Sequence, residues 1–577
     1  MLKPPSQRLA SYFNRLSITR LALLVITAVV LLYGVVYPNL AVLKASLRNN
    51  DSWTVAHYTS VLSQRSTIEA LANSVILSVG TVFLCALVGV SLAFLFERYT
   101  FPGRRLFSVL AALPLVLPPL VGTIAFIFLL GESGILARVV QSGLGLQSPP
   151  WTLSGWPALL LFHTYTMYPF FYVLTGAGLR RIDASLAEAA RSLGGNRFTV
   201  LIRVLLPQLT PSLVAAGLLT FMTSMASFSA PLFFGGGVRV LTLEIYSARQ
   251  RGDAEMAITQ TVVLAIISLT ALIFFQRYEG TRRFVAAAMK GTTRQREVIR
   301  NGVGRAFATV AAIVFSIVLV CPVLTLVLVS FAREGSWTTQ TIPAEYSVSN
   351  YVRLFSEPQA SEVFINSFAM SAIAAVAALA WSFCVVSLIA GEVGSVKQGS
   401  RTDAYWRRFV SLLVLIPWAL PGTVVAVSIA EAYGQASLLL SSFVLVGTFW
   451  ILPVVYFLRF MPLVVRAVQA SREQIDPSLI EAAGSLGANA WRRFVRVTLP
   501  LVSPGAVAGT LLAFVIALGE YVASVLVFVP INRPISIAIA SEMRNFNLGL
   551  AAAYGVVLIG IIAIVMAAAG RLERMRG

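Results

Sequence analysis

The sequence predicts an all-α polytopic membrane protein built from two similar halves. Of its 577 residues, 57% are hydrophobic and 12% are charged, whereas soluble domains carry about 25% charged residues. Apolar runs of about 20 residues or more recur along the chain, which is long enough to cross a hydrocarbon core about 30 Å thick. A polar phrase also occurs twice, at 188–207 and 481–500. A transmembrane β-barrel would show short alternating segments instead.

Apolar runs predict about 12 transmembrane helices in two sets of six. The first set lies near 21–43, 70–96, 106–130, 157–179, 211–234 and 257–276, and the second near 304–331, 362–391, 408–432, 437–460, 503–529 and 548–570. The first run is too long for a signal-peptide core, so we expect a retained span. Six spans return the chain to its starting side, so the repeats, 1–276 and 304–577, are expected to be parallel.

Short arginine clusters in alternate loops predict the orientation in the membrane. Such clusters mark the cytoplasmic side; they are Arg8/Arg15/Arg20, Arg98/Arg104/Arg105, Arg180/Arg181, Arg277/Arg282/Arg283, Arg401/Arg407/Arg408, Arg492/Arg493/Arg496 and Arg571/Arg574/Arg576. We therefore expect both termini and the basic linker 277–303 in the cytoplasm, and 44–69 and 332–361 outside. The net charge of +20 then reflects topology, and no nucleic-acid partner is expected.

The residues that usually carry chemistry are sparse. The three cysteines, Cys85, Cys321 and Cys384, all lie in apolar runs, and His57 and His163 are the two histidines, so no disulfide framework or metal site is expected. The sequence has no phosphate-binding loop, and "FGGGVRV" at 234–240 is interpreted as a turn. We expect neither an enzyme nor a cofactor in this chain.

The repeated phrase reads "EAARSLGGNRFTVLIRVLLP" in the first half and "EAAGSLGANAWRRFVRVTLP" in the second. It predicts a short helix that Asp183 or Asp476 caps and that Gly194 or Gly487 ends. A second short helix is expected to begin at Asn196 or Asn489 and to end before Pro207 or Pro500. Between 182–211 and 475–504, about half of the aligned positions agree.

One interpretation of this phrase is an amphipathic helix lying on the inner leaflet. Two copies with E-A-A-x-x-x-G and a later V-x-L-P are more specific, and they resemble the EAA motif of binding-protein-dependent ABC importer permeases. In that family the EAA loop, here 182–207 and 475–500, docks into a groove of the ATP-binding subunit. The resemblance implies coupling roles for Glu188, Ala189, Ala190, Gly194, Glu481, Ala482, Ala483 and Gly487.

The resemblance also implies the fold and the partners. It implies the type I ABC importer permease fold in a bacterial inner membrane, two copies of an ATP-binding subunit that bind ATP and Mg²⁺, a periplasmic substrate-binding protein and membrane lipid. The stretches 224–246 and 518–539 look most like the ferric-iron and thiamine group. Thiamine, a polyamine, 2-aminoethylphosphonate and sugar phosphate stay open as alternatives to ferric iron. A secondary transporter is the rival of another class, although such proteins build sites from charged or broken spans.

A carboxylate inside an apolar run points to the translocation path. Glu520 lies within 503–529, and the aligned residue of the first half is Ser227. Carboxylates at bilayer depth usually face a bundle interior or a wet cavity. We expect Glu520 to line the path with Ser227, Ser229 and Ser524, where a negative wall would suit a cation. The alternative is a structural Glu520, hydrogen-bonded to a neighbouring span or protonated.

Overall fold

The computed structural model describes residues 18–49, 52–286, 297–299, 301–337, 340–390, 401–434 and 444–574. Residues 287–296 and 300 of the expected linker, the basic residues Arg8 and Arg15, and the beginning of the span expected at 437–460 lie outside the described residues. Within these ranges helices and their connecting loops make up the chain, apart from two-residue strands: β1 (Arg48–Asn49), β2 (Ser52–Trp53), β3 (Tyr99–Thr100) and β4 (Glu297–Val298). β3 pairs in parallel with β4.

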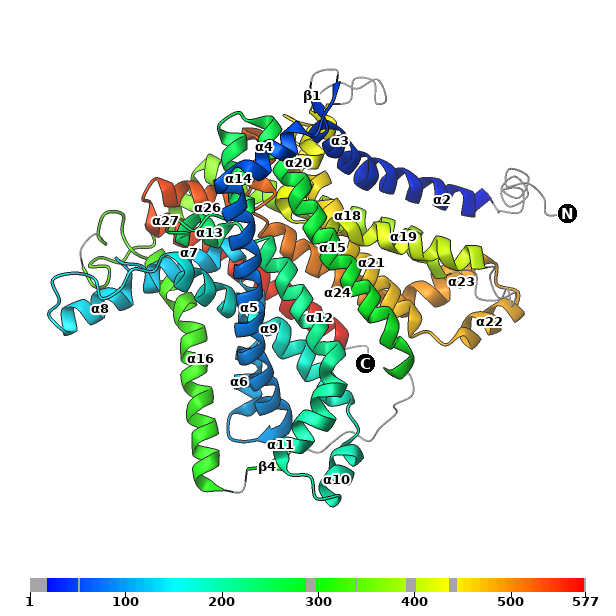
Figure 1. Ribbon diagram of the computed structural model, residues 1–577, viewed down its shortest axis with the longest axis horizontal. Helices are drawn as coiled ribbons and strands as arrows, with labels where there is room; N and C mark the ends of the chain where they lie inside the picture. The colour runs from blue at the N-terminus through cyan, green and yellow to red at the C-terminus, as the bar shows by residue number, and fades with distance from the viewer. Residues whose placement is uncertain are drawn as a thin grey trace. The chain divides into compact units, whose positions relative to one another are not determined.

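The helices of the first repeat follow the expected runs (Figure 1). In chain order they are α2 (Ile18–Leu31), the π-helical turn η1 (Leu32–Val36), α3 (Tyr37–Ser46), α4 (Ala56–Ser63), α5 (Arg65–Arg98), α6 (Arg104–Leu110), the 3₁₀ turn η2 (Leu113–Val116), α7 (Pro119–Leu130), α8 (Ile135–Gly143), α9 (Gly155–Arg181), α10 (Ala184–Ser192), α11 (Arg197–Val200), η3 (Leu201–Leu205), α12 (Leu206–Met225), α13 (Ser229–Phe234), α14 (Leu241–Gln250) and α15 (Ala254–Ala286).

The second repeat reproduces this order. It contains α16 (Gly302–Ser330), α17 (Ser349–Ser356), α18 (Pro358–Ala390), α19 (Arg401–Ala419), α20 (Gly422–Tyr433), α21 (Ile451–Glu473), α22 (Pro477–Ser485), α23 (Ala490–Arg493), η4 (Phe494–Thr498), α24 (Leu499–Leu518), α25 (Ser524–Val527), η5 (Pro530–Asn532), α26 (Ile535–Arg544) and α27 (Leu548–Arg574). The bounds of α4, α10 and α12 recur 293 residues later in α17, α22 and α24. The two halves are therefore structural repeats as well as sequence repeats.

The chain is an all-helical membrane protein. In the described ranges, ten helices are long and apolar enough to cross a membrane, or eleven if the bent pair of α19 and α20 is one span. The expected count was about twelve. α9 does form a helix over the expected run 157–179, but it is not among the ten because polar residues such as His163 and Thr164 lower its hydropathy.

Four expected spans are broken, and one is displaced. The run 106–130 is split at Pro118, and α19 and α20 bend by 105° at a break that contains Pro421. The runs 211–234 and 503–529 end their long helices at Met225 and Leu518. The span expected at 437–460 is wrong by several residues, because α21 begins at Ile451 and continues as a more polar helix to Glu473.

Two compact units make up the chain, and they do not coincide with the two repeats. One unit combines 1–49 with 362–535 and 560–577, and the other combines 50–361 with 536–559. The first helices of the first repeat, α2 and α3, thus belong with the second repeat. In the same way, α16 of the second repeat belongs with the first.

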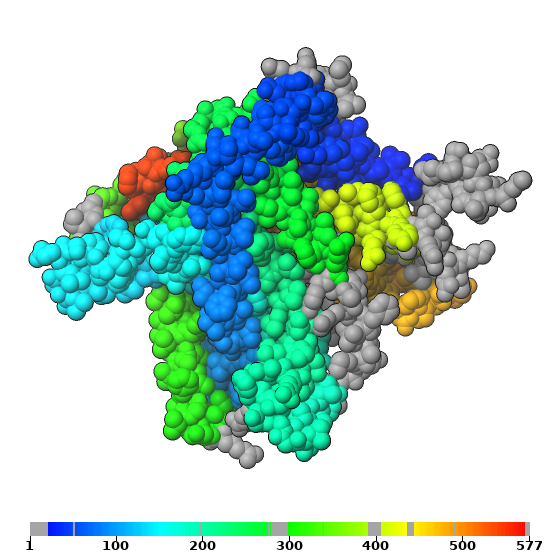
Figure 2. All heavy atoms as spheres, in the orientation of Figure 1, coloured from blue at the N-terminus to red at the C-terminus, as the bar shows by residue number. Residues whose placement is uncertain are grey.

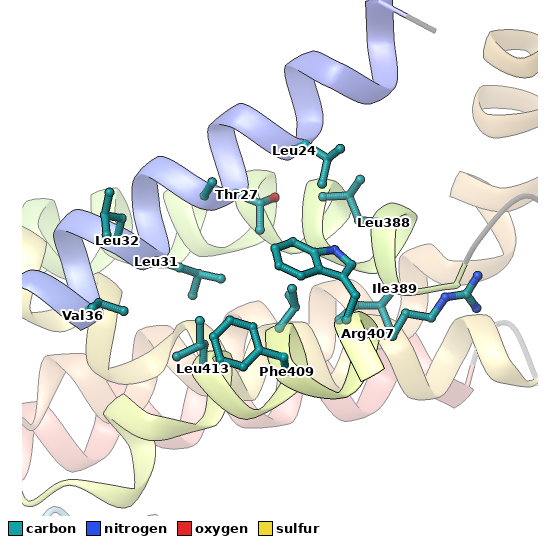
Figure 3. Close-up of a pocket in the computed structure, with 13 residues that line it drawn as sticks. Leu24, Thr27, Leu31, Leu32, Val36, Leu388, Ile389, Arg407, Phe409 and Leu413 are labelled. Atoms are coloured by element: carbon teal, nitrogen blue, oxygen red, sulfur yellow. The ribbon is translucent and has the colours of Figure 1, made fainter. Parts of the chain in front are cut away.

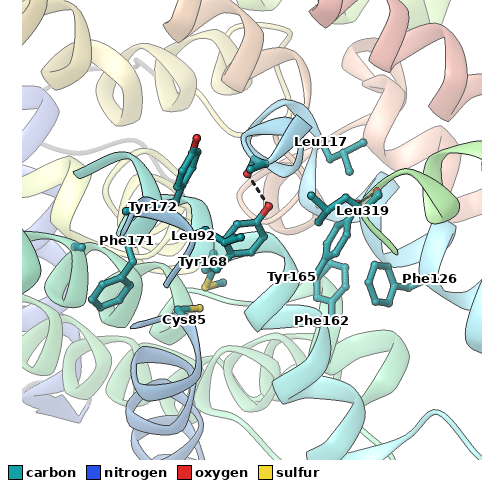
Figure 4. Close-up of a cluster of buried hydrophobic side chains, with 14 of the residues drawn as sticks. Cys85, Leu92, Leu117, Phe126, Phe162, Tyr165, Tyr168, Phe171, Tyr172 and Leu319 are labelled. Carbon is teal, nitrogen blue, oxygen red and sulfur yellow. Dashed lines mark hydrogen bonds between the residues drawn. The ribbon is translucent and has the colours of Figure 1, made fainter. Parts of the chain in front are cut away.

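An aromatic core holds the unit that contains α5, α9 and α16 (Figure 4). Tyr165 donates a hydrogen bond to the Leu319 carbonyl of α16 (2.8 Å), and Tyr168 donates to the Ala111 carbonyl (2.6 Å). The α5–α9 crossing depends on Gly89, because a Cβ there would lie 2.6 Å from Phe171 Cβ and 2.5 Å from the Tyr168 carbonyl oxygen. Small residues allow helices to approach closely in membranes.

In the other unit, α3 packs against α20 and α21 packs against α24. Tyr433 of α20 donates a hydrogen bond to the Tyr33 carbonyl (2.6 Å), and its ring meets that of Tyr37 edge-on at 5.8 Å. Gly509 faces Ala467 where α24 crosses α21. These contacts fix α21 and the end of α24, which carry the polar residues described below.

Candidate coupling loops and translocation path

The two EAA loops begin with the expected caps. Asp183 accepts a hydrogen bond from the Ser185 amide at 3.0 Å, and Asp476 accepts one from the Ser478 amide at 2.9 Å. Each bond satisfies one of the free amides at a helix N-terminus. The bond from the Ser478 backbone amide holds the pKa of Asp476 below its usual value, because it favours the ionised carboxylate.

Both short helices also end in the same way. Gly194 has a φ of 82° and Gly487 a φ of 81°, a left-handed conformation that favours glycine. The amides that follow, of Gly195 and Ala488, bond back to the carbonyls of Ala190 (2.9 Å) and Ala483 (3.0 Å). Six-to-one bonds of this kind close a helix C-terminus.

The segment after each glycine begins as expected and ends differently. Asn196 caps it by accepting from the Thr199 amide (2.7 Å), and Asn489 by accepting from the Arg492 amide (2.8 Å). The expected end before Pro207 and Pro500 is wrong, because the helix runs on into α12 or α24. In the π-helical turns η3 and η4, the amides of Leu206 and Leu499 bond five residues back. The wider turn accommodates the proline that follows, which cannot donate a backbone hydrogen bond.

Each loop presents hydrophobic side chains to solvent at matching positions. Leu193 is 88% exposed and Leu486 is 89% exposed, and 293 residues also separate the exposed aromatic residues Phe198 (68%) and Trp491 (71%). In Figure 2 the loops lie at the surface, teal around α10 and orange around α22. The two loops therefore present matching exposed apolar groups.

The motif residues themselves lie on the same two helices. Glu188, Ala189, Glu481 and Ala482 are exposed, and Ala190 and Ala483 are half-buried. The inner side of the first loop is anchored by Ala187 and Val200, which pack with Phe94 of α5. The structure thus brings the predicted coupling residues together within each loop, and sequence reasoning missed Leu193, Leu486, Phe198 and Trp491 as exposed positions. Their hydrophobic identity at both aligned sites was the available signal.

Glu520 lies at the break after α24 and is 7% exposed. Its Oε2 is 3.3 Å from Arg459 Nε of α21, and its Oε1 accepts from the Ala523 amide at 2.9 Å. Ser524 donates to the Glu520 carbonyl (2.8 Å) and lies 2.7 Å from the Tyr456 hydroxyl. The expectation of a negatively charged wall around Glu520 is therefore corrected, because the guanidinium of Arg459 lies opposite its carboxylate.

Arg459 also connects this cluster to the bend between α19 and α20. A Cβ at Gly422 would collide with Arg459 Nη1, and this nitrogen is buried without a hydrogen-bond partner among the described residues. The guanidinium carbon lies 5.8 Å from the Phe460 ring centre, within the range of a cation–π contact. Two broken spans and α21 thus meet at one ion pair, in which Glu520 is buried and Arg459 is partly buried.

The first repeat has a neutral cluster at the aligned positions. His163 of α9 corresponds to Tyr456, and Ser227 corresponds to Glu520. His163 is fully buried; its Nε2 lies 2.8 Å from Ser227 Oγ, and its Nδ1 lies 3.1 Å from Ser224 Oγ and 3.2 Å from Thr81 Oγ1. His163 is the functional candidate that sequence reasoning left without a role, although a histidine in an apolar run is a recognisable signal.

Ser229 begins α13 and lies 3.4 Å from Thr123 of α7 through the two hydroxyl oxygens. Ser227 and Ser229 therefore have different partners, whereas Glu520 and Ser524 are hydrogen-bonded to each other. Each of the four candidate path residues lies at a break following the long helix of a fifth span.

Another twin contact was missed in the sequence. Asn73 donates to the Arg239 carbonyl (3.0 Å), and Ser74 accepts from the Leu241 amide (2.9 Å). In the second repeat, Asn366 donates to the Ile531 carbonyl (3.2 Å) and Ser367 accepts from the Ile535 amide (2.7 Å). These pairs tie the second span of each repeat to the segment before α14 or α26. The Asn-Ser dipeptide, repeated inside two apolar runs, was the signal.

A model of a protein family matches both halves of the chain. The model of the binding-protein-dependent transport system inner membrane component matches residues 85–280 and again residues 384–576, so each match contains one coupling loop and one polar cluster. The chain belongs to this family. It is the multi-pass inner-membrane permease of a binding-protein-dependent ABC importer and not its catalytic subunit.

Two relatives of this permease match most of the chain, and a third matches less than half of it. A probable ABC transporter permease protein, y4fN, of Sinorhizobium fredii is 30% identical over 90% of this chain and 90% of its own length. The ferric transport system permease protein FbpB of Actinobacillus pleuropneumoniae is 23% identical over 92% of this chain and 75% of its own length. The spermidine/putrescine permease PotB of Haemophilus influenzae is 26% identical and covers 44% of this chain and 90% of its own length.

Among solved structures, a bacterial ABC transporter involved in the import of the acidic polysaccharide alginate is similar to this permease. A chain of that transporter matches with a TM-score of 0.40 and 17% identity, over 48% of this chain and 99% of its own length.

Proposed function

We propose that this permease imports ferric iron that a periplasmic binding protein delivers, with two copies of an ATP-binding subunit as its engine. The observation that carries the substrate is the extent of the matches. The ferric transport permease of Actinobacillus pleuropneumoniae matches over 92% of this chain, whereas the polyamine permease PotB matches 44% and a molybdenum permease of Mycobacterium tuberculosis 37%.

Electrostatics of the path does not select the ion. Glu520 faces Arg459, so the cluster in the second repeat offers no excess negative charge. The corresponding cluster around His163 consists of hydroxyls and one imidazole. The proposal of ferric iron therefore rests on the relatives, and thiamine, a polyamine, 2-aminoethylphosphonate and sugar phosphate stay alternatives for the same machinery.

The two loops at α10 and α22 suit two equivalent grooves of an ATPase dimer. Both carry the same caps, the same left-handed glycine and the same exposed leucine. Twofold partners require such matched surfaces, which one fused chain can supply. In this proposal the loops and both termini face the cytoplasm, and ATP and Mg²⁺ bind to the partner.

The substrate is tested by uptake in cells that lack this gene. We expect the wild-type gene to restore uptake of radioactive ferric iron, and excess thiamine or putrescine to leave that uptake unchanged. A Gly194→Trp/Gly487→Trp variant should stay in the membrane and import nothing, because tryptophan disfavours the left-handed conformation at both helix ends. Restored uptake of a competitor, with no ferric uptake, would reassign the substrate and leave the importer class intact.

A further inference from the structure

An apolar groove runs between α2 and α19 in the unit that holds both helices (Figure 3). Its volume of about 290 Å³ lies at the lower end of the range for small-molecule sites. α2, the end of α18 and α19 provide the lining: Leu24, Thr27, Ala28, Leu31, Leu32, Val36, Leu388, Ile389, Trp406, Arg407, Phe409, Val410 and Leu413. None of the described residues that line it is acidic.

The groove opens where lipid would lie. α2 belongs to a candidate membrane span whose surface is mostly exposed, and α19 belongs to the bent candidate span. Val25 and Val29 on α2 are about half exposed, as expected of side chains that face acyl chains. The occupant of this groove therefore comes from the membrane.

Polar groups gather at one end. Arg407 and Trp406 lie near the beginning of α19, while Leu413 lies further along the helix. In Figure 3, Arg407 and Leu24 lie toward one end of the groove, and Val36 and Leu413 lie toward the other. Tryptophan and arginine are typical of the level at which headgroups meet the hydrocarbon core.

Thr27 adds an independent sign of a ligand. This threonine is 3% exposed and lines the groove, and its hydroxyl has no hydrogen-bond partner among the described residues. Buried hydroxyls normally find a partner. From Thr27 to Val36 the helix rises about 14 Å, so the hydrophobic part of the groove has the length of a substantial part of an acyl chain.

We propose that this groove binds one anionic phospholipid, with its phosphate at Arg407, an ester carbonyl oxygen accepting from Thr27, and an acyl chain along Leu31, Val36 and Leu413. A protein helix about 10 Å across would not fit into a groove of about 290 Å³. The positive charge of Arg407, with Arg408 beside it in the sequence, favours an anionic headgroup over a zwitterionic one.

The test is native mass spectrometry of the purified full chain after equilibration with mixed phosphatidylglycerol and phosphatidylcholine vesicles. We expect one tightly held phosphatidylglycerol on the wild type. Ala28→Trp fills the groove from its exposed side and should lose that lipid. Ala22→Trp, on the same helix and outside the lining, should keep it. Arg407→Gln should lower the preference for phosphatidylglycerol about fivefold, whereas Arg408→Gln, outside the lining, should change it less.

Equal retention by Ala28→Trp and Ala22→Trp would overturn the proposal, as would equal binding of the two lipids by the wild type. A second measurement applies if Ala28→Trp fails to fold. Brominated phosphatidylglycerol should quench the fluorescence of Trp406, measured as the difference between the wild type and Trp406→Phe. Absence of quenching would mean that another segment or molecule fills the groove. None of these outcomes depends on whether the transported solute is ferric iron.

Discussion

The two repeats can be compared in two regions, the coupling loops and the polar clusters. At α10 and α22 the caps, the glycine φ angles and the exposed leucines agree closely. At the breaks of the fifth spans, the first repeat has His163 among hydroxyls, whereas the second has Arg459 paired with Glu520. The backbone pattern is shared there too, but the chemistry differs.

This difference fits the roles that we propose for the two regions. A loop that binds one of two identical partners has to keep the same surface in both repeats. A path that a solute crosses has no such requirement, since its two walls meet one asymmetric ligand. We therefore interpret the coupling loops as duplicated and the clusters as specialised.

The largest effect is expected from charging the exposed leucines. Leu193→Asp or Leu486→Asp should each reduce ATP-driven uptake about tenfold or more, because a charge in an interface centre is desolvated on docking. The ATPase that co-purifies with the permease should fall in parallel. Leu144→Asp, at another exposed leucine, serves as the control. Unequal losses at the two leucines would break the equivalence of the loops.

Next in size is the ion pair. Arg459→Met removes the charge opposite Glu520 and should cost about 3 kcal/mol of unfolding free energy. Glu520→Gln alone should also destabilise, and the double variant should cost less than the sum of the single variants. The unfolding free energies of the wild type, the two single variants and the double variant, measured in detergent, complete this double-mutant cycle. Additive costs would contradict the pairing, and a loss of uptake by Glu520→Gln without a loss of stability would favour a path role.

The neutral cluster should respond more weakly. His163→Leu removes the ring nitrogens that face Ser227 and Ser224, with an expected cost of about 1–2 kcal/mol. Tyr456→Phe at the aligned position removes one hydroxyl contact and should cost about 1 kcal/mol. The same unfolding assay compares them. A cost for His163→Leu as large as that of Arg459→Met would remove the distinction between the clusters.

The smallest effect concerns the cap of α22. Because the pKa of Asp476 is lowered in the folded protein, its stabilising contribution is complete above its ordinary pKa of about 3.9 and is lost as the pH falls through the lowered value. Asp476→Ala should speed hydrogen exchange in α22 about fivefold at neutral pH, with α10 unchanged. If the same acceleration persisted below the lowered pKa, the ionised cap would not be its cause.

Hydropathy predicted most spans because burial in a bilayer requires long apolar helices. It could not place breaks, since residues 226–228 are as compatible with a helix as their neighbours. Contacts from distant residues mark this interruption: His163 packs against the Ser227 hydroxyl, and Thr242 donates to the Ser227 carbonyl. It also predicted the beginning of α21 at the wrong position, because helix ends depend on caps and contacts rather than on apolarity.

The coupling loops were the most predictable part of the candidate site. Asp183, Asn196 and Gly194 act through local backbone geometry, which sequence spacing encodes directly. The partner of Glu520 was not predictable in this way. Arg459 is 61 positions earlier in the chain, and only the crossing of α21 with the end of α24 brings the two side chains together.

The composition of the compact units has a consequence for how such a chain arose. The first helices of each repeat, and also residues 536–559 of the second, belong with the other repeat. We therefore infer that a single ancestral repeat needed a second copy to complete its core. A homodimer with exchanged first helices satisfies this requirement before any fusion. Joining the two genes then needed only a connection from α15 to α16, after which each polar cluster could mutate independently of its twin.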